Sequence, residues 1–132
     1  MFAITNRGTL TCTVEGYPQV VLYSSHGLAL PFRYAQGGGA YVTRKRPVTV
    51  VLVPGSSAYI LVAKYRCDIG ISGTATAIRL TLPAAQGAVF TGREAVGAAS
   101  PDLSYCRGGR RDPGQAVEVS PVEPSPQAAI PF

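Results

Sequence analysis

The residues of this chain that could do chemistry begin with its single histidine, His26, which follows Ser24 and Ser25. A serine beside a histidine can act as a nucleophile activated by a base, and an acidic group normally orients that base. Here the three residues share one short segment, and no acidic residue lies nearby in the sequence. We therefore interpret residues 24–27 as an exposed hairpin turn, with Gly27 at a position of positive φ.

Two further patterns are similar to functional motifs but lack their essential parts. Gly37-Gly38-Gly39 is not followed by the Gly-Lys-Ser/Thr of a phosphate-binding loop, so it predicts only a flexible loop. The seven acidic residues are scattered, and no pair of them favours a glycosidase. One histidine and no Cys-x-x-Cys give no support for a zinc site. We therefore expect no catalytic residue, metal or cofactor from the motifs.

Charge indicates a binding role more than a catalytic one. The formal net charge is +5, and the only dense basic cluster ends the loop predicted for residues 33–46. Tyrosine and arginine are enriched in binding hot spots, so this segment is the preferred binding loop. Its predicted contact residues are Tyr34, Tyr41, Arg44, Lys45 and Arg46. The expected partner is an unknown protein or an anionic envelope component, and no nucleic acid, because no nucleic-acid-binding motif surrounds the cluster.

The elements that must position these residues are centred on residues 47–65. Two apolar runs, 48–53 and 58–63, are rich in β-branched residues and are separated by a turn at Pro54-Gly55. Each run is apolar on both faces, which predicts two consecutive central strands covered by a second layer or by a partner.

Short alternating runs elsewhere in the chain predict the remaining strands. They fall at residues 2–6, 11–15, 19–23, 28–32, 75–82 and 114–120, with a strand-like piece around 88–91 in an otherwise loop-like segment, 84–100. Only 14% of residues are charged, and the chain has 15 glycines and 11 prolines. Together these features predict an all-β fold, an immunoglobulin-like antiparallel β-sandwich of about seven or eight short strands. Residues 1–120 would form this domain, and the proline-rich residues 121–132 a flexible tail.

The three cysteines indicate a disulfide and therefore an exported protein. In an immunoglobulin-like order, Cys12 and Cys67 would lie in turns at the same end of the sandwich, so we favour a Cys12–Cys67 bridge. Cys106 would then be left over, with a partner outside this chain or in a missing segment. Tyr17 and Tyr65 flank the proposed bridge, and we expect them to pack in the core.

A family resemblance rests on several stretches taken together. They are TCTVEGYP at residues 11–18, VLVPGSSAY at 51–59, CRGG at 106–109 and a first strand that ends at Asn6. Over residues 2–109 the chain resembles the actinobacterial family called domain of unknown function 4232. The resemblance implies an exported or lipoprotein-anchored domain of immunoglobulin-like type, which usually begins with a further strand carrying another cysteine. It implies no functional residues.

These observations lead to an expected function. No run reaches the roughly 18 apolar residues that span a bilayer, so we expect a chain that does not cross the membrane and is lipid-anchored at most. We expect a non-enzymatic binding or interaction module of the actinobacterial cell envelope, located outside the cytoplasm. The alternatives are a hydrolase whose site is assembled only in three dimensions and a structural accessory domain of a longer envelope protein.

Overall fold

A computed structural model describes residues 1–83, 89–95 and 103–131 of the 132-residue chain, and for residues 89–95 it describes the backbone alone. Its strands, in chain order, are β1 (Phe2–Thr5), β2 (Cys12–Val14), β3 (Gln19–Tyr23), β4 (Arg33–Gln36), β5 (Val50–Leu52), β6 (Ser57–Ile60), β7 (Val62–Lys64), β8 (Ile71–Thr74), β9 (Ala77–Pro83), β10 (Val89–Ala95), β11 (Ser104–Cys106) and β12 (Ala116–Val119). The helical segments are η2 (Gly109–Arg111), η3 (Pro113–Gln115) and α1 (Pro126–Ala129). The all-β class predicted from the sequence is confirmed.

One layer of the fold is built around β12. This strand pairs antiparallel with β7 and parallel with β4. The contact continues past the end of β12, where Tyr59 and Glu123 exchange main-chain hydrogen bonds of 2.8 and 2.9 Å. β1 pairs antiparallel with β6. The parallel β4–β12 pair differs from the wholly antiparallel sandwich that the sequence predicts, and the immunoglobulin-like strand order stays a prediction.

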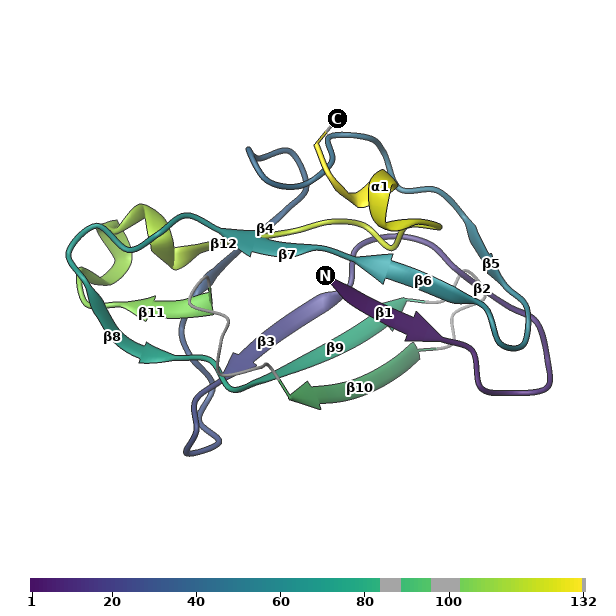
Figure 1. Cartoon of the computed structure of the whole chain (residues 1–132), viewed down its shortest axis with the longest axis horizontal. Helices are drawn as coiled ribbons and strands as arrows, with labels where there is room; N and C mark the ends of the chain where they lie inside the picture. The colour runs from purple at the N-terminus through teal and green to yellow at the C-terminus, as the bar shows by residue number, and fades with distance from the viewer. Residues whose placement is uncertain (84–88, 96–102, 132) are drawn as a thin grey trace.

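The second layer is the antiparallel sheet β10-β9-β3. Figure 1 shows it running beneath β7 and β12, with β8 and β11 at one end of the molecule and β2 and β5 at the other. Alternate residues of β3 and β9 enter the core between the layers, as the sequence alternation predicts. The fully buried side chains from the two layers include Leu22, Ile60, Ile78, Val117 and Val119.

The apolar residues 47–65 are distributed among three separate pairings. β5 pairs with β2, β6 pairs with β1, and β7 pairs with β12. The turn at Pro54-Gly55 is present, with Gly55 at φ +84°. However, Val51 and Val53 are exposed, because β5 lies in a two-stranded sheet with only one face on the core. The prediction of a central strand is therefore wrong for β5, which has a neighbouring strand on one side only.

Two segments predicted to be irregular are ordered in the structure. Residues 33–36 form β4 rather than the start of a loop, whereas residues 28–32 hold only a single β-bridge at Ala29. Residues 121–131 pack against the body, with Val122 and Ala129 fully buried. The main-chain N–H of Thr43 donates to the carbonyl of Ala129 at 2.9 Å. This segment differs from the flexible tail that its prolines predict, because its few apolar side chains find space beside β6.

The predicted strand-like piece around residues 88–91 overlaps the start of β10 at residues 89–91, and β10 continues to Ala95, paired along its whole length with β9. Residues 84–88 and 96–100 of the predicted loop-like segment lie outside the described residues.

Candidate functional site

The candidate site is a hollow of about 450 Å³ at the end of the molecule that carries β8 and β11. It is lined by Tyr41, Tyr65, Arg66, Asp68 and Pro113. The two tyrosine rings meet edge to face with their centroids 4.8 Å apart, yet they remain 38% and 44% exposed. The hollow thus offers aromatic surface, guanidinium donors and a carboxylate acceptor to a ligand.

Tyr41 is held in place by a buried carboxylate. The two oxygens of Glu118 on β12 accept hydrogen bonds from the main-chain N–H groups of Ala40 and Tyr41, at 2.9 and 2.8 Å. Gly39 lies against the same carboxylate, so closely that a Cβ there would overlap it. The triple-glycine segment is therefore an ordered bend packed against Glu118 and not the flexible loop predicted. Glycine is required at residue 39, because a larger side chain would overlap the Glu118 carboxylate.

Tyr65, on the other side of the hollow, begins a segment that is held by β7 and by the disulfide. The Lys64 ammonium donates to the carbonyl of Tyr65 at 2.9 Å and lies 3.9 Å from Sγ of Cys67. Cys67 is bonded to Cys106, at the end of β11. The backbone that carries Tyr65 is thus fixed at both ends of the segment 64–67.

The Cys67–Cys106 bridge corrects the Cys12–Cys67 bridge predicted from the sequence. Cys12 is free and exposed on β2, where it pairs with Leu52 of β5. Figure 1 shows β2 and the β7–β8 connection at opposite ends of the molecule. The prediction failed because it assumed that the turn after the first strands and the turn after β7 lie at the same end.

Asp112 anchors the segment that carries Asp68. This buried carboxylate accepts hydrogen bonds from the main-chain N–H groups of Gly114, Asp68 and Ile69, at distances of 2.9 to 3.5 Å. Burial raises the pKa of the Asp112 carboxyl, but these donors and the positive charge of Lys64 outweigh it and hold the pKa below its ordinary value. Asp112 therefore stays ionised at neutral pH, and it fixes the floor of the hollow.

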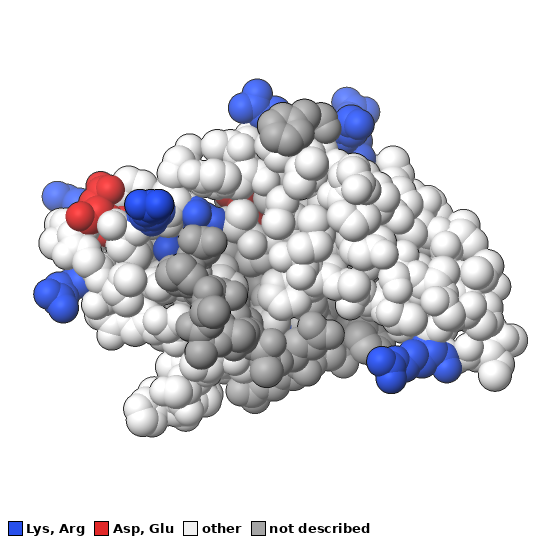
Figure 2. All heavy atoms as spheres, viewed as in Figure 1, with Lys and Arg blue, Asp and Glu red and all other residues white. Residues whose placement is uncertain are grey.

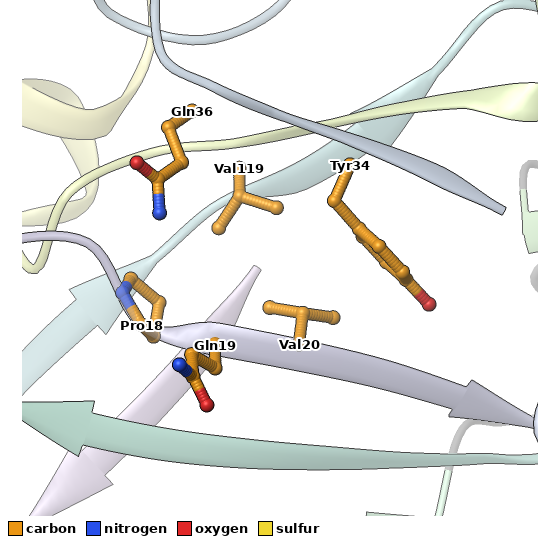
Figure 3. A pocket seen from close by; sticks show the side chains of 6 residues that line it. All are labelled: Pro18, Gln19, Val20, Tyr34, Gln36 and Val119. Carbon is orange, nitrogen blue, oxygen red and sulfur yellow. The ribbon is translucent and has the colours of Figure 1, made fainter.

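A second hollow, of about 380 Å³, opens between β3 and β4. Figure 3 shows the side chains around it, which are Pro18, Gln19, Val20, Tyr34, Gln36 and Val119. None of them is charged. The Tyr34 hydroxyl already accepts a hydrogen bond from the N–H of Leu22 at 3.0 Å, and burial raises its pKa. This hollow offers a ligand little beyond two carboxamides, so it is the weaker candidate.

The structure divides the predicted binding residues among different places. Tyr34 lies on β4 beside the second hollow, whereas Tyr41 lines the first. Arg44, Lys45 and Arg46 are exposed, and they follow Thr43, which bonds to the C-terminal segment. Figure 2 shows basic side chains at several separate places on this face and not as one patch. Whether any of these residues binds a partner stays a prediction.

Sequence reasoning missed four of the five residues around the first hollow. Tyr65 was expected in the core, and Arg66, Asp68 and Pro113 carried no motif. Their position next to Cys67 was the available signal, because a disulfide fixes the backbone of its neighbours. That signal required the correct partner, Cys106, which brings residues 107–113 beside residues 65–69.

Among the described residues, no group of three or more His, Cys, Asp or Glu side chains could hold a metal ion. Within the same part of the chain, no helix is both long and apolar enough to cross a membrane.

These features define an all-β domain with a disulfide beside a preformed aromatic hollow. The chain belongs to the family described as Domain of unknown function (DUF4232), whose sequence profile matches residues 1–123. The resemblance noted from the sequence is thereby confirmed. Neither a curated protein nor a solved structure matches the chain.

Proposed function

We propose that this protein is a non-enzymatic binding module that acts outside the cytoplasm, at the actinobacterial cell envelope, and that it binds through the hollow lined by Tyr41 and Tyr65. The observation that carries the proposal is the exposure of two contacting tyrosine rings on a backbone that is already fixed. Buried tyrosines serve packing, whereas exposed tyrosines beside arginine are typical of binding hot spots.

Preorganisation strengthens this interpretation. Glu118 holds the Tyr41 main chain, and the Lys64 ammonium and the Cys67–Cys106 bridge hold the segment of Tyr65. A site whose side chains are already placed loses less conformational entropy when a ligand binds. The entropy cost of ordering these segments is therefore incurred when the protein folds, and it does not reduce the affinity for a ligand.

The disulfide supports a location outside the cytoplasm. Disulfides persist in oxidising compartments and are rare where thioredoxin and glutathione keep thiols reduced. The bridge lies beside the hollow, and Cys106 is buried, so it is part of the folded framework. Export also agrees with a role at the envelope, with lipid anchoring as one route by which a longer precursor would be retained there.

Sedimentation with isolated actinobacterial cell envelopes tests the proposal. The purified chain should sediment with the envelope material, and a Tyr41→Ala/Tyr65→Ala variant should lose about tenfold or more in affinity, because hot-spot tyrosines contribute most of the energy of an interface. Leu28→Ala, in an exposed turn away from the hollow, is the matched control. Equal binding by the double variant and the wild type, with both folded by circular dichroism, would contradict the proposed site.

A further inference from the structure

Four arginines surround the same end of the molecule as the hollow, and the described residues there carry fewer negative charges than positive ones. Arg66 lies between β7 and Cys67, Arg107 follows β11, and Arg110 and Arg111 belong to η2. The segment that carries Arg66 contacts the segment that carries the other three arginines, because the N–H of Arg107 donates to the carbonyl of Gly70 at 2.9 Å. All four side chains are exposed, and none bonds to another described residue. We call this set the arginine rim.

The described carboxylates at this end do not neutralise the rim. Asp112 is buried, and its oxygens are occupied by main-chain donors and lie near the charge of Lys64. Asp68 is exposed inside the hollow and is one charge against four. Figure 2 shows basic groups at this end of the molecule, with acidic groups beside some of them. A partner that covers the rim must therefore supply negative charge.

Apolar side chains are exposed beside the rim. Ile69 is 69% exposed and follows Asp68, and Ile71 is 49% exposed on β8, where it pairs with Cys106. A hydrated phosphate polymer would gain nothing from these side chains. A protein surface would bury them together with Tyr41 and Tyr65, which gives the usual anatomy of an interface, with an apolar centre and a charged border.

The guanidinium groups of the rim can bind a carboxylate or a phosphate through two parallel hydrogen bonds, so the arginines by themselves do not distinguish these partners. Arginine is enriched in protein interfaces, where lysine is depleted. The shape of the hollow favours a protein partner more directly. A bilayer surface is flat and cannot fill a hollow of about 450 Å³, whereas a protruding side chain can.

From this charge complementarity we propose that the hollow and the arginine rim form a docking surface for an acidic segment of another protein. Aspartate and glutamate side chains of the partner pair with the rim, and an apolar or aromatic side chain of the same segment enters the hollow and packs against the rings of Tyr41 and Tyr65. This inference rests on the proposed function, because it names the partner of the same hollow.

The test compares probes of different chemistry on the full chain. The probes are a poly(Glu,Tyr) copolymer, poly-glutamate of the same length, inorganic polyphosphate and vesicles of phosphatidylglycerol. We expect the copolymer to bind more tightly than poly-glutamate, because only the copolymer can fill the hollow. Binding should weaken as salt rises, because the rim charges are exposed.

Matched variants distinguish the contribution of the arginine rim to binding from the contribution of the net charge of the protein. Arg110→Ser/Arg111→Ser should weaken copolymer binding about fivefold or more, at up to about fivefold for each exposed ion pair. Arg7→Ser/Arg79→Ser removes the same charge from exposed positions outside the rim and should change the affinity about twofold or less. Equal losses in the two double variants would overturn the proposal, since total charge alone would then explain the binding.

Nuclear magnetic resonance shifts of Tyr41 and Tyr65 distinguish failure of the acidic protein partner from failure of the hollow as a binding site. Shifts at these residues on titration with polyphosphate or vesicles, with none on titration with the copolymer, would overturn the acidic protein partner and leave the hollow as a binding site. If cell envelopes bind and the Tyr41→Ala/Tyr65→Ala variant binds them equally well, the proposed function at this hollow fails by itself.

Discussion

At the scale of single residues, two buried glutamates of the C-terminal segment have opposite roles. Glu118 accepts two main-chain hydrogen bonds and holds the turn that carries Tyr41. Glu123 is 4% exposed, and its Oε1 has no hydrogen-bond partner among the described residues. Burial raises the pKa of the Glu123 carboxyl, and the nearby charge of Lys45 opposes this only in part. One carboxylate therefore stabilises the fold, and the other costs stability when it is ionised.

The first prediction concerns the pH dependence of this cost. Above the ordinary glutamate pKa of about 4.3, the unfolded chain ionises Glu123 more readily than the folded chain does. The raised pKa therefore favours unfolding, and the effect grows as the pH rises from the ordinary pKa through the raised one. We expect Glu123→Gln to increase the free energy of unfolding at pH 7 and to change it little at pH 3.5, as measured by urea unfolding.

Glu118→Gln is the matched control for that experiment. It removes a charge from a carboxylate whose two oxygens are both occupied, so it should destabilise the protein at pH 7. A stabilisation by Glu123→Gln of the same size at both pH values would mean that ionisation is not the cause.

The second prediction concerns Gly39. A Cβ at this position would overlap the Glu118 carboxylate, so Gly39→Ala should reduce the free energy of unfolding by about 1–3 kcal/mol. Gly73→Ala is the control, because no atom lies within 4 Å of its Cβ position, and it should change stability by about 0.5 kcal/mol or less. Denaturant unfolding measures both, and equal effects of the two substitutions would contradict the close packing of Gly39.

At the scale of elements, the β7–β8 connection and the segment after β11 are fastened to each other. The bridge joins Cys67 to Cys106 across a separation of 39 residues. The side-chain amide of Gln115 adds to it, because its Oε1 accepts the N–H of Cys106 at 2.9 Å. Gly114 lies so close to the Cys106 sulfur and the Arg66 carbonyl that a larger side chain would not fit. These contacts place the arginine rim and the hollow side by side.

A cysteine substitution series tests this arrangement. Closing a loop of this size stabilises a protein by about 4 kcal/mol on the chain-entropy model, so Cys67→Ser/Cys106→Ser should lose about 2–4 kcal/mol. Cys12→Ser should be nearly neutral, because Cys12 is exposed and unbonded. Intact mass after alkylation without reduction should show one modified thiol. Alkylation of Cys67 or Cys106 under those conditions would contradict the bridge.

The next prediction concerns the C-terminal segment, which is ordered although its prolines predict a flexible tail. Removing residues 125–132 deletes α1, whose Ala128 N–H is capped by the Ser125 hydroxyl, and removes the carbonyl that pairs with Thr43. We expect a loss of about 2 kcal/mol in the free energy of unfolding and faster hydrogen exchange at the Thr43 amide. Unchanged exchange at Thr43 would mean that the segment is the flexible tail predicted from its prolines.

At the scale of the whole molecule, the two layers are joined by side chains as well as by the shared core. The Tyr34 hydroxyl on β4 accepts a hydrogen bond from the main-chain N–H of Leu22 on β3. This N–H lies on the edge of β3 that faces away from β9. Such a bond replaces the ladder hydrogen bond that an edge strand lacks. It also closes one end of the hollow shown in Figure 3.

Removing that hydroxyl is the prediction at this scale. Tyr34→Phe should lower the free energy of unfolding by about 1 kcal/mol, because it leaves the N–H of Leu22 without its partner. The control is Tyr59→Phe, whose hydroxyl bonds to no described residue, and it should be close to neutral. Thermal unfolding measures both, and a neutral Tyr34→Phe would show that this bond does not contribute to joining the layers.

The sequence by itself determined the local features of this protein. The alternation of β3 and β9, the bounds of β3 and the turn at Gly27 agree with the structure. Each depends on residues one to three positions apart, since strand side chains alternate and positive φ favours glycine. The family was evident for the same reason, because its stretches are short and contiguous.

Only the tertiary structure decided what depends on distant partners. The choice of Cys106 for Cys67, the separate pairings of β5, β6 and β7, and the meeting of Tyr41 with Tyr65 all follow from strand order. Strand order is selected by burial summed over the whole core, which no local pattern records. The candidate site was beyond prediction for that reason: its five residues come from three separate parts of the chain and meet only when the fold is complete.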